Sequence, residues 1–404
     1  MSNLQKEALF IHEKFKGKLS VEVKMPLNSM KDLSLAYSPG VAEPCKQIYD
    51  QPEKVYDYTI KGNLIAVVSD GTSVLGLGDI GPEAAMPVME GKSALFKSFA
   101  GIDAVPICLD TKDPEEIIKT VKLLQPAFGG INLEDIASPN CFYIEERLKK
   151  EMNIPVFHDD QHGTAIVTAA GLINSLKLVD KKIDEIKVVI NGAGAAGIAI
   201  VKLLITMGVN DIIMCDTRGA IYEGRQEGMN PLKESISRIT NHRKLKGQLA
   251  DVIVNADVFI GVSSAGAMTK EMVETMAGEA IIFAMANPVP EIMPEEAKAA
   301  GARVVGTGRS DLPNQVNNVL AFPGIFRGAL DVLATDINDE MKAAAVKAIA
   351  GLIQSEELEE DYVIPAPLDS RVVPAVREAV AKAAWETGVA RKEVLSNQLV
   401  NTQQ

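Results

Sequence analysis

The chain has 404 residues, enough for two or three domains of about 150 residues each. Hydrophobic residues make up 47% and charged residues 24% of it, an ordinary balance for a globular protein. Its 41 Lys and Arg residues face 54 Asp and Glu residues, and the net charge of −13 argues against nucleic acid or an anionic membrane as the main partner.

Neither a signal peptide nor a membrane span is expected. Lys and Glu interrupt the apolar residues of the N-terminus, and the longest uncharged stretch, Gln161–Leu176, is shorter than the roughly 18 residues that cross a bilayer. The widely separated cysteines form no C-x-x-C pair, which indicates reduced thiols: Cys45, Cys108, Cys141 and Cys215. These features predict a cytoplasmic protein.

Up to about Asp160, short apolar runs alternate with Pro- and Gly-rich turns. The predicted strands here are Leu64–Ser69, Ala104–Leu109 and Pro155–His158. The predicted helices are Glu83–Phe99, Pro114–Leu124 and Asn140–Lys150. Asp113 can cap the helix that starts at Pro114.

From Gly163 onward, strands and helices alternate regularly, which is typical of a parallel sheet covered on both faces. The predicted helices are Thr164–Leu176, Gly197–Met207 and the amphipathic Pro374–Trp385, whose apolar residues need a surface such as the first domain. The predicted strands are Lys187–Ile190, Asp211–Cys215, Val258–Val262, Ala280–Ala284 and Arg303–Val305.

The chain is therefore predicted to be an α/β protein with two domains. Residues 1–160 would form an N-terminal α/β domain that carries the catalytic and metal-binding residues. Residues 161–390 would form a Rossmann-type, doubly wound parallel sheet with a C-terminal helix, and residues 391–404 a tail.

A dinucleotide site is predicted at the strand that begins with Lys187. This strand runs into a G-x-G-x-x-G turn and then a helix: Gly192, Ala193, Gly194, Ala195, Ala196 and Gly197. Such a turn lets a pyrophosphate approach the helix N-terminus. Asp216 ends the next strand, where an acid accepts hydrogen bonds from the adenosine ribose of NAD. Arg218 could instead favour the extra phosphate of NADP, so NAD and NADP both stay open.

Two acidic pairs, Glu134-Asp135 and Asp159-Asp160, each follow an apolar run and precede a predicted helix. At neighbouring strand ends they would suit Mg²⁺ or Mn²⁺. Helix caps and solvated surface acids are equally good explanations of the spacing. A zinc or iron site of His158, Asp160 and His162 requires helical geometry where a strand is expected, and is disfavoured.

Two further residues have both a structural and a catalytic interpretation. Lys92 lies on an otherwise apolar face of a predicted helix. It could be a surface lysine whose aliphatic stem packs on that face, or a desolvated amine whose lowered pKa lets it act as a general base. Tyr37 precedes a Pro-Gly turn, where its ring could pack or its phenol could donate a proton.

Together the motifs resemble the malic enzymes, in the same order and from about Lys31 to Val389. They are LAYSPGVAEPC, GLGDIG, INLEDI, FHDDQHGTA, NGAGAAG, MANPVPE and QVNNVLAFPGIFRGAL. The resemblance is to the short bacterial form. It implies oxidative decarboxylation of (S)-malate to pyruvate and CO₂ with NAD or NADP and with Mg²⁺ or Mn²⁺.

The resemblance also implies roles for residues that match the family's motifs. The metal ligands would be Glu134, Asp135 and Asp160; the catalytic residues Tyr37, Lys92 and Asp159; the substrate contacts Asn287, Asn317 and Asn318, with Asn287 also at the cofactor. Larger members carry an arginine before GLGD that grips a malate carboxylate. The matching stretch here, Asp70–Val74, has none, so the resemblance leaves open how the carboxylates are held.

The resemblance further implies a homodimer, whose site could be shared between chains. Two other functions are compatible with parts of the same pattern. A malolactic enzyme would keep its NAD bound and release lactate, and a dinucleotide sensor would have lost its chemistry. The presence of all five of Tyr37, Lys92, Glu134, Asp135 and Asp160 argues against such a loss.

Overall fold

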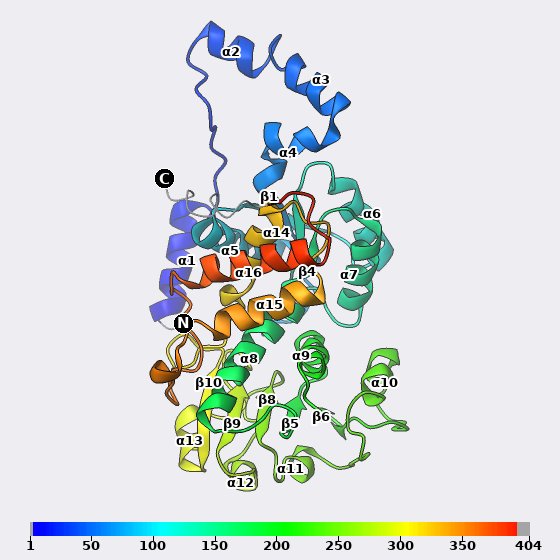
Figure 1. Ribbon diagram of the computed structural model, residues 1–404, viewed down its shortest axis with the longest axis vertical. Coiled ribbons are helices and arrows are strands. Elements are labelled where there is room, and N and C mark those ends of the chain that lie inside the picture. The colour runs from blue at the N-terminus through cyan, green and yellow to red at the C-terminus, as the bar shows by residue number, and fades with distance from the viewer. Residues whose placement is uncertain (1–2, 394–404) are drawn as a thin grey trace.

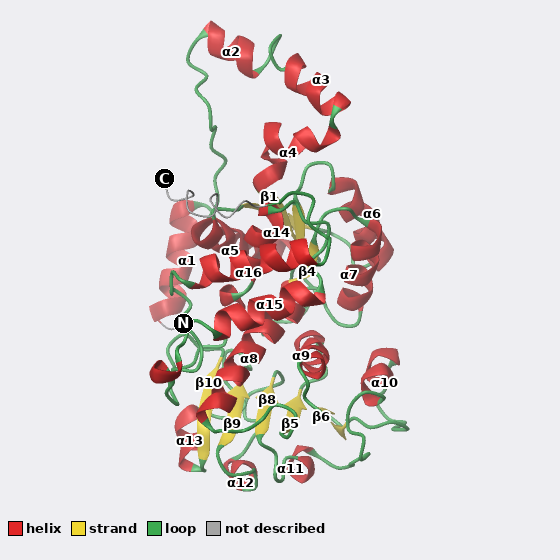
Figure 2. Cartoon of the chain, viewed as in Figure 1, coloured by secondary structure: helices red, strands yellow, loops and turns green. Residues whose placement is uncertain are grey.

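The computed structural model describes residues 3–393, which form two sheets of mainly parallel strands with helices packed around them (Figures 1 and 2). The predicted tail lies almost wholly outside the described residues. Among residues 3–393, no helix is both long and apolar enough to span a membrane.

The first sheet has four parallel strands in the order β2-β1-β3-β4. They are β1 (Leu64–Ser69), β2 (Asp103–Cys108), β3 (Gly130–Leu133) and β4 (Val156–His158). In the register of β3 and β4, Leu133 pairs with His158. The residues that follow these two strands therefore emerge side by side at the carboxyl edge of the sheet.

Both faces of the first sheet are buried, as its continuous apolar strands predict. One face packs against α6 (Pro114–Leu124) and α7 (Asn140–Glu151). The other packs against α5 (Pro82–Ala100) and, from far along the chain, α14 (Phe322–Asp331).

Aromatic rings hold α14 in that position. Phe326 contacts Phe96 of α5 and Phe157 of β4, with ring centroids 5.2 and 5.8 Å apart. The C-terminal helix α16 (Val372–Glu386) packs on α14 and on α15 (Asp339–Ala350). Its apolar face thus reaches the first sheet through α14.

The second sheet has the order β10-β9-β8-β5-β6-β7, parallel except for the short β7 (Gly219–Ala220). Its other strands are β5 (Lys187–Asn191), β6 (Asp211–Asp216), β8 (Val258–Gly261), β9 (Ala280–Ala284) and β10 (Ala302–Thr307). One face packs against α8 (Asp159–Leu178) and α9 (Ala195–Thr206), the other against α11 (Leu249–Val252), α12 (Lys270–Glu274) and α13 (Pro294–Ala299). This is the predicted doubly wound arrangement.

One predicted helix start is wrong: α8 begins at Asp159 and not at Thr164. Apolar residues become frequent only from Ala165, whereas the first turn is polar and includes Gly163. Asp159 and Asp160 suit a helix N-terminus because the helix dipole attracts negative charge there. Residue 160, the predicted domain boundary, lies within this first turn.

The N-terminal helices were not predicted. They are α1 (Asn3–Phe15), α2 (Met30–Ala36), α3 (Ala42–Asp50) and α4 (Val55–Tyr58). Residues 20–50, here called the arm, stand away from both sheets (Figure 1). Large apolar residues of the arm are exposed, among them Val21 at 96% and Tyr49 at 88%. Short helices outside these regions were also not predicted, among them α10 (Pro231–Ser237).

Candidate active site

Four acidic residues gather where β3 and β4 end. Glu134 and Asp135 follow β3, and Asp159 and Asp160 are the first residues of α8 after β4. Because the two strands are neighbours in register, both acidic pairs reach the same edge of the sheet. Of the alternatives that the spacing left open, the structure shows the one in which the two pairs converge.

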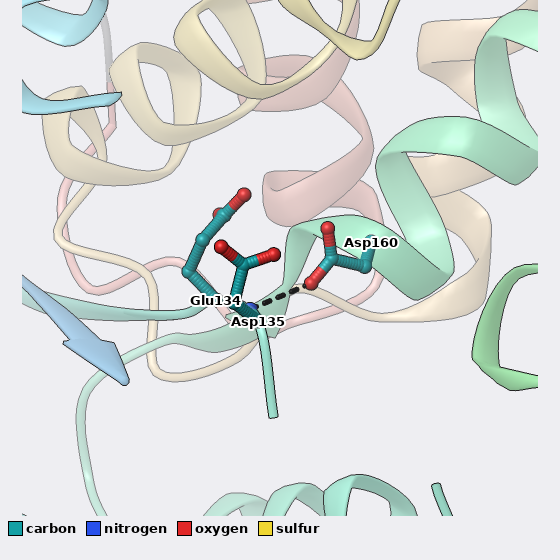
Figure 3. Close-up of side chains that lie close together, drawn as sticks. All are labelled: Glu134, Asp135 and Asp160. Carbon is teal, nitrogen blue, oxygen red and sulfur yellow. Dashed lines mark hydrogen bonds between the residues drawn. The ribbon is translucent and has the colours of Figure 1, made fainter. Parts of the chain in front are cut away.

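Glu134, Asp135 and Asp160 form the tightest group, with one carboxylate oxygen of each within 4.8 Å of the others (Figure 3). Asp135 donates its backbone N–H to Asp160 Oδ2 at 2.8 Å, and Asn132 donates to Glu134 Oε2 at 2.8 Å. Within the described residues, Asp135 Oδ2 is buried without a hydrogen-bond donor. Three convergent carboxylates with a free acceptor fit a hard divalent cation.

The alternative zinc or iron site is not formed. His162 Nε2 lies 2.9 Å from Glu145 Oε1. His158 Nδ1 is 3.8 Å from Asp160 Oδ2, beyond hydrogen-bond distance.

Lys92 lies on α5, and its side chain is next to the acids. It is only 8% exposed, so the surface-lysine interpretation is wrong. Its Nζ is 2.6 Å from Asp159 Oδ2 and 2.9 Å from Glu134 Oε1. The ring of Phe322, at the start of α14, has its centroid 4.4 Å from the same Nζ.

The shared burial shifts every pKa in this cluster. Burial, together with the charge of nearby Asp160, raises the pKa of Glu134 to about 7 and that of Asp135 to about 9. Burial likewise raises the pKa of Asp159 to about 7 and that of Asp160 to about 6, although Lys92 opposes this rise. The four acids share a single nearby positive charge, that of Lys92, so their negative charge is only partly balanced.

The pKa of Lys92 is raised, opposite to the direction expected for a desolvated base. Burial alone would lower this pKa, but the charges of Asp159, Glu134 and Asp160 outweigh it. With the acids ionised and no cation among them, the lysine is held protonated.

The asparagines suggested by the resemblance lie in three different surroundings. A side-chain carbon at Gly163 would be 1.9 Å from Asp159 Oδ1 and 3.0 Å from Asn318 Cβ, so Asn318 lies close to the first residues of α8. Asn317 instead caps the short turn that begins at Asn318, accepting the backbone N–H of Val319 at 3.0 Å. Asn287 lies against Gly308, beyond the end of β10.

Tyr37 is not brought to the cluster within this chain. It ends α2 in the arm (Figure 1) and is 70% exposed, whereas Glu134, Asp135, Asp159 and Lys92 are buried at the end of the first sheet.

The glycine turn after β5 has the shape that a pyrophosphate needs. Gly192 has φ +121°, and a Cβ there would be 2.4 Å from the carbonyl oxygen of Val262. A Cβ at Gly197 would be 1.9 Å from the Gly192 carbonyl, whereas one at Gly194 would meet open space. The free N-terminus of α9 therefore opens onto a cradle that fits a dinucleotide phosphate.

Asp216 is held by two cations that the sequence analysis missed. Arg225 forms two hydrogen bonds with its carboxylate, one at 2.9 Å, and Lys233 Nζ lies 2.6 Å from Oδ2. Burial opposes ionisation of Asp216, but these bonds lower its pKa to about 2. Arg218 contributes its backbone N–H at 2.9 Å, while its exposed side chain pairs with Glu227. Arg225 lies in an irregular stretch and Lys233 in the short helix α10, so neither has a fixed spacing from the glycine motif that could have identified it.

Comparison with known proteins identifies both halves of the chain. The family model for the malic enzyme N-terminal domain matches residues 16–149, and that for the malic enzyme NAD binding domain matches residues 161–385. A bifunctional malic/malolactic enzyme of Bacillus subtilis is 70% identical over 96% of this chain and 95% of its own length. An NAD-dependent malic enzyme of Geobacillus stearothermophilus is 60% identical over 93% of this chain and 78% of its own.

The fold agrees with these similarities. The crystal structure of malic enzyme from Pyrococcus horikoshii superposes with a TM-score of 0.93 at 50% identity, covering 98% of this chain and 94% of that one.

Metal binding is expected to stabilise the protein more at pH 9 than at pH 6. A raised carboxyl pKa means that the metal-free folded chain holds protons that the unfolded chain has lost, so ionising the cluster costs stability as pH rises through about 6 to 9. A divalent cation offsets that cost and binds the ionised acids only. The Tm shift on adding Mn²⁺ at the two pH values measures this. Equal shifts would contradict it, and Asp160→Asn should reduce the shift at pH 9.

Proposed function

The chain belongs to the malic enzyme family, a family of NAD(P)-dependent, decarboxylating oxidoreductases, and from this premise we propose that it converts (S)-malate to pyruvate and CO₂. The observation that carries the proposal is the buried contact of Lys92 with Asp159 and Glu134 at 2.6 and 2.9 Å, beside two further carboxylates. A lysine placed in this way can exchange a proton with a substrate held against the acids.

The nucleotide cradle lies against the first domain. Ala195, the first residue of α9, packs against the core of that domain. A nicotinamide bound through its pyrophosphate at α9 can therefore approach a substrate at Lys92. Glu134, Asp135 and Asp160 would hold Mg²⁺ or Mn²⁺, and Asn287, Asn317 and Asn318 would line the substrate side.

Held by Glu134, Asp135 and Asp160, a divalent cation would polarise the C2 oxygen of malate, and a nicotinamide bound at the glycine turn would supply the hydride acceptor. Lys92 takes the proton of the C2 hydroxyl as that oxygen becomes a carbonyl. Asp159 accepts a hydrogen bond from Lys92 at 2.6 Å, which orients the amine. The carboxylate beta to the new carbonyl then leaves as CO₂, and Tyr37 protonates C3 to give pyruvate.

The charge balance explains when Lys92 can act as a base. Glu134 and Asp160 are two of the three acids that raise its pKa. When their charge is neutralised by a bound cation, the desolvation of a buried amine dominates and its pKa falls. The metal site thus controls the protonation of Lys92.

We propose that the protein is a homodimer in which Tyr37 serves the site of the partner subunit. The arm presents exposed apolar residues, including Leu35 and Tyr37 themselves, and stands away from its own chain's sheets (Figure 1). The cluster in each chain contains the proposed base but lacks the proposed acid. A second copy would both cover the arm and complete the site.

A malolactic activity is the second candidate. It is favoured by one observation, the 70% identity to a bifunctional malic/malolactic enzyme. Such an enzyme would return the hydride to pyruvate before releasing its product. A mere dinucleotide sensor would not need the buried Lys92–Asp159 pair.

Incubating the protein with malate, Mn²⁺ and NAD or NADP is expected to yield pyruvate and reduced cofactor in equal amounts. Lys92→Ala should lower kcat by about 10² to 10⁴, as expected for loss of a general base. Chromatography measures the pyruvate formed, and absorbance measures the reduced cofactor. Formation of lactate without reduced cofactor would identify the malolactic reaction. If the protein consumed no malate, the proposal would be contradicted.

Nucleotide choice should depend on Lys233 more than on Arg218. Arg225 and Lys233 place two positive charges on the one negative charge of Asp216, so the repulsion of a 2′-phosphate by Asp216 is offset. Lys233→Ala is expected to raise KM for NADP by roughly tenfold, the worth of a charged hydrogen bond, and to change KM for NAD little. Arg218→Ala is the matched comparison, and a larger NADP-specific loss there would restore Arg218 as the phosphate ligand.

Mixing two inactive variants tests whether the site is shared. Tyr37→Phe and Lys92→Ala are each expected to be nearly inactive in overall turnover. If Tyr37 acts across the dimer, random heterodimers carry one intact site, so an equal mixture should recover about a quarter of wild-type activity. Steady-state rates after unfolding and refolding the mixture measure it. No recovery, with heterodimers detected by a tag, would place Tyr37 in its own chain's site or outside the chemistry.

A further inference from the structure

Glu145 is a buried carboxylate that the proposed reaction does not use. It lies on α7, behind the junction of β4 and α8. It accepts the backbone N–H of His158 at 3.1 Å, and its two oxygens lie 2.9 and 3.0 Å from Nε2 of His162. Both partners belong to the segment that carries Asp159 and Asp160.

In the sequence, the two residues that Glu145 contacts lie on either side of Asp159 and Asp160. His158 directly precedes Asp159, and His162 follows Asp160 by two residues. The side chain of His158, the N-cap of α8, makes no capping hydrogen bond. The start of this helix is therefore held from outside by Glu145.

Burying a carboxylate is costly unless hydrogen bonds and charge compensate for it. Burial would raise the pKa of Glu145, but His162, His158 and Lys149 lower it to about 2, so the side chain remains an ionised, strong acceptor. An apolar residue at this position could fill the space between α7 and α8 but could not fix the His158 backbone.

We propose that Glu145 is a positioning residue of the metal centre: by holding His158 and His162, it sets the directions in which Asp159 and Asp160 leave the helix start. Asp159 then reaches Lys92, and Asp160 joins Glu134 and Asp135 (Figure 3). The inference rests on the proposed function, because it assigns Glu145 to the cation site of that reaction.

The test measures Mn²⁺ affinity without substrate or nucleotide, from the EPR signal of free Mn²⁺, together with Tm. Glu145→Ala is expected to weaken Mn²⁺ binding by about 10- to 100-fold, as for residues that orient metal ligands. Glu145→Gln should restore most of the affinity, because its amide oxygen can still accept the His158 N–H. Glu146→Ala, the next residue on α7 with an exposed side chain, is the matched control and should bind as wild type does.

A folded Glu145→Ala protein with wild-type Mn²⁺ affinity would overturn the positioning role. If that variant does not fold, His162→Ala removes one of the two partners and should weaken Mn²⁺ binding several-fold, with wild-type affinity overturning the role instead. Wild-type protein that fails to bind Mn²⁺, or Asp160→Asn with unchanged affinity, would overturn the metal centre itself and this inference with it.

Discussion

The rest of the structure depends on one electrostatic constraint: four carboxylates are packed around a single buried ammonium group. Like charges in a region of low dielectric repel strongly, and the buried ions, all but Asp160, have also lost most of their hydration. The single lysine offsets part of this cost through its contacts with Asp159 and Glu134, and the start of α8 offsets part through its dipole. The remaining negative charge raises the acids' pKa values and favours a divalent cation. The same excess of charge, which shifts several pKa values in one place, makes this cluster the candidate active site.

A site of this kind needs rigid support, and the fold provides it by bringing distant segments together. The acids come from two neighbouring strand ends, whereas Lys92 comes from α5 and is covered by Phe322 of α14. Phe326, one turn further, packs on both α5 and β4. The C-terminal part of the chain therefore closes the site of the N-terminal sheet, and α8 connects that sheet with the nucleotide domain. Movement between the two sheets would change the distance between the nicotinamide and the acids.

Much of this could be predicted from the sequence because the signals are local. Strands such as Leu64–Ser69 are continuous apolar runs, and the glycine turn followed by Asp216 has a spacing that only a few folds use. The two acidic pairs converge because β3 and β4 are parallel neighbours, whereas their spacing alone explained helix caps and solvated acids equally well. What the sequence could not give depends on contacts between segments. The early start of α8 depends on Glu145 and the dipole, and the direction of the Lys92 pKa shift depends on how many acids surround it.

The positions of Tyr37 and Lys233 show two different limits of motif reasoning. Lys233 lies 17 residues beyond Asp216, and only the fold of the intervening loop brings its ammonium to that carboxylate. A motif therefore identifies Asp216 but not the net charge of the side chains around it, which a bound nucleotide would contact. Tyr37 lies in a motif that resembles the family's catalytic tyrosine, yet its position in one chain is exposed and away from the acids. A sequence motif carries no information on which chain of an assembly its residue serves. The proposal that Tyr37 serves a second copy rests instead on the apolar side chains of the arm, which are exposed in the single chain.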